Sequence, residues 1–156
     1  MEALKADGDE VHAFVKFQIM QYAAIYEAVI TYLLWSKYED HPDLLAISTH
    51  KAFKKMDALG KKTKITLDDE QIYTCVLRDT KTPKTSIAFK DKVDCAVRIG
   101  FVPAEYSDDI KRLYELRNLA HIETEAEKQI EVEIEHSRAG YWRLKPFLEK
   151  VSSACV

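Results

Sequence analysis

Arg117 and His121 are the residues whose types and spacing could carry chemistry in this sequence. On a helix, side chains four positions apart leave the same strip of the surface, separated by about 40°. Ile110, Leu113 and Tyr114 continue this strip one and two turns earlier. The expected helix therefore turns a guanidinium and an imidazole toward its buried side, where both could act on one group.

This pair suits RNA cleavage by attack of the 2′-hydroxyl on the neighbouring phosphate. Histidine titrates near neutral pH and can accept or donate the proton. Arginine offers paired, planar donors to the non-bridging oxygens of a phosphorane. Because each chain supplies one such histidine, a general acid and a general base together require a two-fold homodimer with both Arg117–His121 strips in one groove.

An internal ion pair is the other interpretation of Arg117. A buried guanidinium stays charged, so it needs an anion from the protein or from a ligand. Glu27, which has apolar neighbours in the first helical segment, is the natural internal partner. A closed Arg117–Glu27 pair would favour a non-catalytic helical module that dimerises or docks a larger partner. An open two-fold groove would favour the nuclease.

The elements that must position these residues are mainly helical. Apolar residues recur at three- and four-residue spacing over residues 10–38, which predicts one long helix. The His41-Pro42 pair should end it, because proline lacks a donor and restricts the residue before it. Asp43 is expected to cap a second helix that runs to Gly60.

The second half of the chain begins with a different pattern. Short runs rich in Ile, Val, Thr and Tyr predict a small β-hairpin insertion near residues 64–78. A helix is expected over residues 89–99 with Gly100 as the left-handed residue after it. Ser107 is expected to cap the helix that carries Arg117. The whole predicts an antiparallel helical bundle.

The tail is ambiguous by pattern. Isoleucine and valine alternate with glutamate over residues 129–135, which is typical of a strand, whereas the surrounding Glu, Ala and Lys favour a helix from about Thr124. Strand and helix both remain open for 129–135. A last helix with a kink at Pro146 is expected to follow.

Composition limits the class of protein. The chain has 156 residues, 47% of them hydrophobic, with 23 basic against 26 acidic side chains and a net charge of −3. This predicts one folded domain over residues 1–156 rather than a disordered chain. No apolar run is long enough for a membrane span. Three widely spaced cysteines without a CxxC motif suit the cytoplasm, and the histidines and cysteines match no metal motif, so neither a metal nor a cofactor is expected.

Three segments together carry a resemblance to a known family: FVKFQIMQYAAIYEAVITYLL, FKDKVDCAVRIGFVPAEY and the helix end YELRNLAHI. They resemble the HEPN ("higher eukaryotes and prokaryotes nucleotide-binding") domains, over most of the chain apart from residues 61–85. The resemblance implies a helical bundle, a homodimer and a metal-independent endoribonuclease of toxin–antitoxin or anti-phage defence systems. It implies catalytic roles for Arg117 and His121, and a phosphate-orienting or helix-fixing role for Asn118.

The motif departs from the family pattern. The family has four to six residues between the arginine and the histidine, and this sequence has three. Members with weakened motifs often serve as binding modules. The alternative function is therefore a non-catalytic dimerisation or binding module of a larger defence or regulatory system.

A basic segment is the remaining candidate for RNA binding. It carries lysines that could follow a phosphate backbone, and the alternative for them is an ordinary solvated face. The lysines proposed to contact RNA are Lys51, Lys54, Lys55, Lys61 and Lys62. An acidic stretch over residues 123–135 would repel RNA. An antitoxin or effector protein is a further candidate partner.

Overall fold

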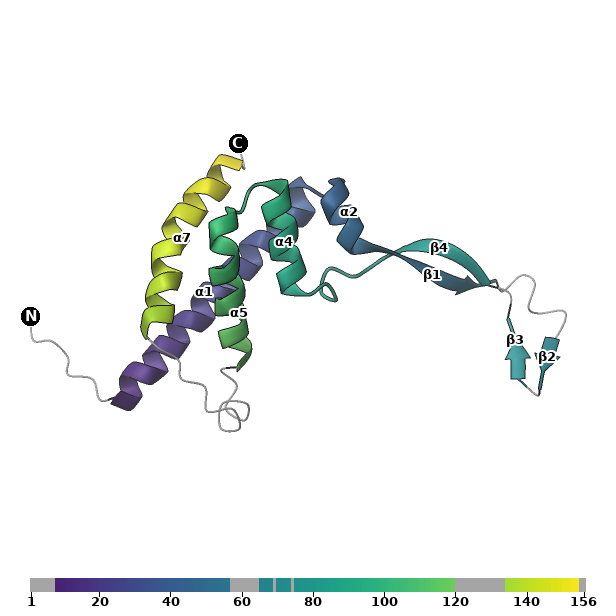
Figure 1. The fold of residues 1–156 in the computed structure, drawn as a ribbon, viewed down its shortest axis with the longest axis horizontal. Coiled ribbons are helices and arrows are strands. Elements are labelled where there is room, and N and C mark those ends of the chain that lie inside the picture. Colours follow the sequence, from purple (N-terminus) through teal and green to yellow (C-terminus); the bar gives the residue numbers. More distant parts are fainter. Residues whose placement is uncertain (1–7, 57–64, 69, 74, 120–133, 155–156) are drawn as a thin grey trace, which may run out of the picture.

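The structure is a computed structural model that describes residues 8–56, 65–68, 70–73, 75–119 and 134–154 (Figure 1). The helices are α1 (Gly8–Lys37), α2 (Pro42–Ser48), α4 (Phe89–Ile99), α5 (Ser107–Leu119) and α7 (Ile134–Ala154), with a 3₁₀ turn η1 (Ala104–Tyr106) before α5. The strands are β1 (Thr49–Lys55), β2 (Ile65–Leu67), β3 (Glu70–Ile72) and β4 (Cys75–Lys81). Helices α1, α4, α5 and α7 form a bundle, and the strands form an arm that projects from it (Figure 1).

Helix α1 is the spine of the bundle, because it contacts α4, α5 and α7. Its apolar stripe is buried over five turns, from Val15 to Leu34. Tyr26 is fully buried near the middle, with its ring edge-on to Phe147 of α7 at 4.8 Å between centroids. The Tyr26 hydroxyl donates a hydrogen bond to the carbonyl oxygen of Gly140 at 3.3 Å, so even the polar end of this core residue is satisfied.

Two positions require glycine, Gly140 because of space and Gly100 because of its backbone conformation. A Cβ added to Gly140 would lie 2.7 Å from Cδ2 of Tyr22, so glycine lets α7 approach α1 closely. Gly100 ends α4 with φ = 96°, and its N–H donates to the carbonyl of Ala96 at 3.0 Å. The left-handed glycine predicted after this helix is confirmed, and it reverses the chain so that α5 runs opposite to α4 (Figure 1).

The arm begins where α2 ends. β1 and β4 pair antiparallel from Thr49↔Lys81 to Lys55↔Cys75, and β2 and β3 form a second short pair at the end of the arm (Figure 1). Leu67 pairs with Glu70, which leaves a tight turn in which Asp68 adopts φ = 51°. Asp is one of the few residues that tolerate this left-handed conformation.

The predicted fold class, a mainly helical bundle with a small β-hairpin, is confirmed. The prediction of a helix from Asp43 to Gly60 is wrong beyond Ser48, because the segment 49–55 pairs with β4 and this pairing overrides the helix-forming lysines and alanine. The β-region is therefore larger than the predicted 64–78. Residues 57–64 lie outside the described residues.

Two predicted caps are also wrong in detail. His41, not Asp43, is the N-cap of α2, and its Nδ1 accepts a hydrogen bond from the N–H of Asp43 at 3.2 Å. Ser107 is a buried helical residue that continues η1 into α5. In the tail, Ile134 and Glu135 begin α7, which continues through Pro146, whereas 124–133 lie outside the described residues.

Candidate functional site

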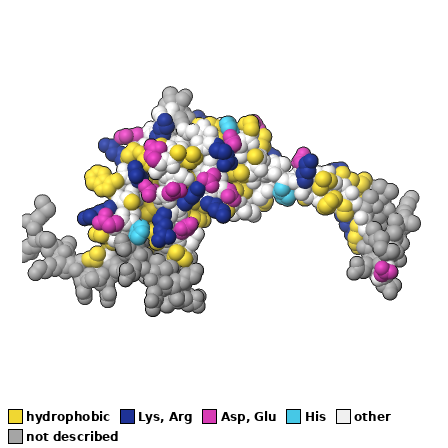
Figure 2. Space-filling view, in the orientation of Figure 1, with side chains coloured by type: hydrophobic (Ala, Val, Ile, Leu, Met, Phe, Trp, Pro, Cys, Tyr) yellow, Lys and Arg dark blue, Asp and Glu magenta, His cyan; other side chains and the backbone are white. Residues whose placement is uncertain are grey.

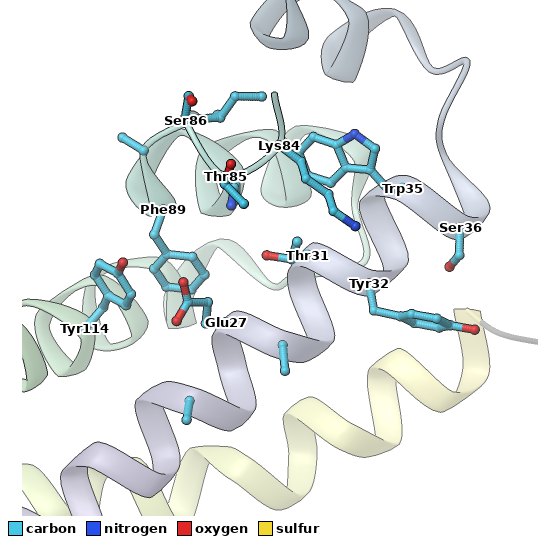
Figure 3. Close-up of a pocket in the computed structure, with 15 residues that line it drawn as sticks. Glu27, Thr31, Tyr32, Trp35, Ser36, Lys84, Thr85, Ser86, Phe89 and Tyr114 are labelled. Atoms are coloured by element: carbon cyan, nitrogen blue, oxygen red, sulfur yellow. The ribbon is translucent and has the colours of Figure 1, made fainter. Parts of the chain in front are cut away.

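A pocket lies between α1, the segment 84–88 and the first turns of α4, beside α5 (Figure 3). Its volume of about 860 Å³ is within the range of small-molecule sites. Glu27, Thr31 and Trp35 reach it from α1 at successive turns, because residues four apart share one face of a helix. The opposite wall includes Lys84, Phe89 and Lys92.

Arg117 pairs with Glu27 at the edge of this pocket. The guanidinium Nη1 of Arg117, on α5, donates to Oε2 of Glu27, on α1. The guanidinium also lies 5.5 Å from the ring centroid of Tyr114, one turn earlier on α5. The side chains of Arg117 and Glu27 are 36% and 31% exposed, so the pair is partly buried. The protein itself therefore supplies the anion that Arg117 was expected to need.

The other residues of the motif are not brought into this pair. Asn118 is exposed on the last turn of α5. His121 lies outside the described residues, as do Lys61 and Lys62 of the basic segment. The predicted strip is confirmed as far as Arg117, since Ile110 and Leu113 are buried on the same side of α5.

Lys92 is a pocket residue that the sequence analysis did not identify as a candidate. It is only 5% exposed, and its ammonium lies 5.7 Å from the ring centroid of Trp35. Burial lowers the pKa of Lys92; the charge of Glu27 opposes this effect and that of Lys84 adds to it. The available signal was its position: Lys92 is three residues after Phe89 and one before Val93, inside the apolar strip of α4.

The lysines of the described part of the arm lie on both faces of a two-stranded ribbon. In the ladder, Lys51 is opposite Asp79 and Lys55 is opposite Cys75, so both share one face. Lys54, opposite Val76, is on the other face. No residue of β1 or β4 is buried. All three lysines are exposed and could reach a ligand outside the protein.

Apolar side chains interrupt these charges. Phe53 and Leu77 face each other across the ladder, and they are 76% and 50% exposed. They lie on the face of Lys51 and Lys55, and the ammonium of Lys55 lies 2.9 Å from the ring centroid of Tyr73. Figure 2 shows hydrophobic and basic side chains together along the arm. One face of the arm therefore presents cationic and apolar side chains together.

The described residues contain neither a metal-binding cluster nor a helix that could span a membrane. No group of three or more His, Cys, Asp or Glu in this part of the chain could hold a metal ion. No helix there has both the length and the apolar character that crossing a bilayer requires. Comparisons of the chain with protein-family models, with curated proteins and with solved structures each gave no match.

Proposed function

We propose that this protein is a HEPN-like helical module that binds single-stranded RNA on its β1–β4 arm without cleaving it. The observation that carries the proposal is the arm itself, where cationic side chains flank an exposed aromatic ring. Single-stranded nucleic acid is bound by this combination, in which the charges follow the backbone and the rings stack on bases. In this proposal Arg117 has a structural role and holds α5 to α1 through Glu27.

The distribution of charge supports the arm as the RNA-binding surface. β1 and β4 carry five basic residues against the single acidic residue Asp79; the basic residues are Lys51, Lys54, Lys55, Arg78 and Lys81. Residues 49–81 together have eight basic and five acidic side chains, a net charge of +3. The remaining residues have fifteen basic and twenty-one acidic side chains, a net charge of −6. A polyanion is therefore attracted to the arm and repelled by the rest of the chain.

The architecture of the arm is a second support. A two-stranded ribbon with both faces in water is marginally stable by itself, because it has no apolar face to bury. The contact of RNA with Phe53 and the neighbouring lysines would supply the missing interactions. The proposal therefore accounts for why the chain exposes an apolar pair in the middle of a basic ribbon.

A direct test measures the binding of a fluorescent single-stranded RNA to the full chain by anisotropy, over a range of salt concentrations. The triple variant K51A/K54A/K55A should bind at least about tenfold more weakly, with a shallower salt dependence, because fewer counterions are released. The matched control K90A/K145A/K150A removes three exposed lysines from α4 and α7 and should bind like the parent. Equal RNA binding by the parent and by K51A/K54A/K55A would contradict the proposal.

The nuclease is the second candidate function, because Arg117 is partly exposed although it pairs with Glu27. Arg117 lies at the carboxyl end of α5, partly exposed, and Glu27 lines an open-sided pocket (Figure 3). If Arg117 exchanged Glu27 for a phosphate, it could stabilise the phosphorane while His121 moved the proton. This candidate also requires the homodimer, so that two such histidines share one groove.

The homodimer has a candidate surface in this structure. Aromatic side chains that are more than half exposed occur on α1 and α7, at Phe14, Phe17, Tyr32, Tyr141 and Trp142. Obligate dimer interfaces are enriched in such residues. A measurement of the mass in solution by light scattering should give twice the mass of the chain, and the double variant F14E/F17E should give the mass of one chain. A parent protein of single-chain mass would leave the nuclease without its second histidine.

A further inference from the structure

Lys92 is a buried cation without an ionic partner of its own. Lys92 is 5% exposed and lines the pocket, and no described residue forms an ion pair with its ammonium. The printed sequence gives α4 no acidic residue on the same strip. Lys111 of α5 shows the usual arrangement, since its ammonium donates to Asp94 at 2.5 Å. A lysine is rarely this buried unless it is paired, so Lys92 requires an explanation.

Glu27 does not fill this role. Its carboxylate is engaged by Arg117, and although its charge favours the ammonium form of Lys92, it forms no contact with it within ion-pair distance. Lys84, at the edge of the same pocket, adds a second positive charge. Once the Arg117–Glu27 pair is counted as neutral, the charge that remains in the pocket is positive.

Thr31 is a second, independent sign of a missing partner. Its Oγ1 is buried and, within the described part of the chain, has no hydrogen-bond partner. Thr31 lies between Glu27 and Trp35, and its hydroxyl is directed into the pocket (Figure 3). A buried hydroxyl without a partner costs about 1–3 kcal/mol. A ligand that accepts hydrogen bonds from both Thr31 and Lys92 would satisfy both groups.

The walls of the pocket indicate the rest of the ligand. The indole of Trp35 lies 5.7 Å from the Lys92 ammonium, and Phe89 lines the pocket from α4 with Tyr114 packed against it at 4.4 Å between ring centroids. Flat aromatic walls beside a cation suit a flat ring that carries an anionic group. The volume of about 860 Å³ accommodates such a molecule.

We propose that this pocket binds a small organic anion, a molecule that carries an aromatic ring and a carboxylate or phosphate, with the anionic group at Lys92 and Thr31 and the ring beside Trp35. The site is separate from the arm and does not depend on RNA binding. A carboxylate and a phosphate share the chemistry that Lys92 and Thr31 recognise, and the experiment distinguishes them.

The test uses the full chain with W142F, which removes the exposed second tryptophan and leaves Trp35 as the sole indole. Trp35 emission is titrated with benzoate, adenosine monophosphate, inorganic phosphate and the uncharged benzamide. Benzoate or adenosine monophosphate should change the emission saturably, and benzamide should bind at least about tenfold more weakly, because it cannot form the charge-assisted hydrogen bond. No saturable change with any anionic probe would overturn the proposal.

Two variants assign the binding to the named groups. K92M should weaken binding of the preferred anion by about tenfold or more, whereas K90M, an exposed lysine on the same helix, should bind like the parent. Without ligand, K92M should melt at the same temperature as the parent or higher, since it removes a buried charge. T31V, which keeps the shape of Thr31, should weaken binding severalfold, and it provides the test if K92M fails to fold. Undiminished binding by folded K92M or by T31V would contradict the proposal.

Discussion

The bundle and the arm of this protein use the same residue types in opposite ways. In the bundle, a core of aromatic and aliphatic side chains is buried, although aromatic rings on α1 and α7 stay exposed, and several charged residues pair across helices: Arg117 with Glu27, Lys111 with Asp94, and Arg143 with Asp109. In the arm, Phe53 and Leu77 face water and the lysines outnumber the acids. The bundle therefore pairs several of its charges internally and has a buried core, whereas the arm has no buried residue on β1 or β4 and leaves its charges and its apolar pair available to a partner.

Phe147 of the bundle and Phe53 of the arm allow a direct comparison of the two regions. Phe147 is fully buried against Tyr26, and F147A should lower the free energy of unfolding by about 3–5 kcal/mol, because it removes a large ring and leaves a cavity. Urea unfolding followed by circular dichroism measures this loss. A loss below about 1 kcal/mol would mean that the core is not organised around α1 and α7 as described.

F53A is the counterpart in the arm and should affect binding instead of stability. Since the ring of Phe53 is mostly exposed, its removal should change the free energy of unfolding by less than about 0.5 kcal/mol. If a base stacks on it, RNA binding should weaken by about 1–3 kcal/mol. Anisotropy and urea unfolding on the same preparation separate the two effects. A destabilised F53A protein with unchanged RNA affinity would reverse the proposed division between bundle and arm.

The Arg117–Glu27 pair tests whether the bundle uses the motif arginine for structure. A double-mutant cycle with R117M, E27Q and R117M/E27Q should give a favourable coupling of about 1 kcal/mol, reduced from that of a fully buried pair because both side chains are about one-third exposed. All three variants should bind RNA like the parent. No coupling, together with weaker RNA binding by R117M alone, would mean that Arg117 contacts RNA and does not stabilise the fold.

Tyr26 allows a smaller, pH-dependent test of the core. Burial, and next the charge of Asp109, raise the pKa of the Tyr26 hydroxyl above its ordinary value of 10.0. A group with a raised pKa in the folded state stabilises the fold fully below its unfolded pKa, and this stability is lost as the pH rises above about 10. Y26F should cost about 1 kcal/mol at neutral pH, through the lost bond to Gly140, and should lose less stability than the parent in alkali. Identical alkaline unfolding of both proteins would contradict the burial of this hydroxyl.

The sequence was sufficient to predict the bundle because its signals are local. The spacing of apolar residues, the His41-Pro42 stop and Gly100 each act over a few residues, and α1, α4 and the buried side of α5 follow them. The sequence predicts a helix at β1 instead of a strand, because the residues that pair with it lie 20 to 32 positions away and lysine, alanine and phenylalanine in a row carry no period of two.

The candidate site also has one part that the sequence predicts and one part that it does not. Glu27 was identified as the partner of Arg117 because both occupy buried strips of long helices, where an unpaired charge is costly. The pocket around Lys92 could not be predicted, because it depends on how the segment 84–88 passes over α1. No spacing within one helix encodes such a contact between segments.

The most direct test of the central claim is the fate of an end-labelled single-stranded RNA incubated with the full chain and followed by anisotropy and by denaturing gel. We expect the parent and H121A to bind it equally and to leave it at full length, and K51A/K54A/K55A to release it. RNA that the parent shortens and H121A leaves intact would contradict a non-cleaving module and would establish the nuclease instead.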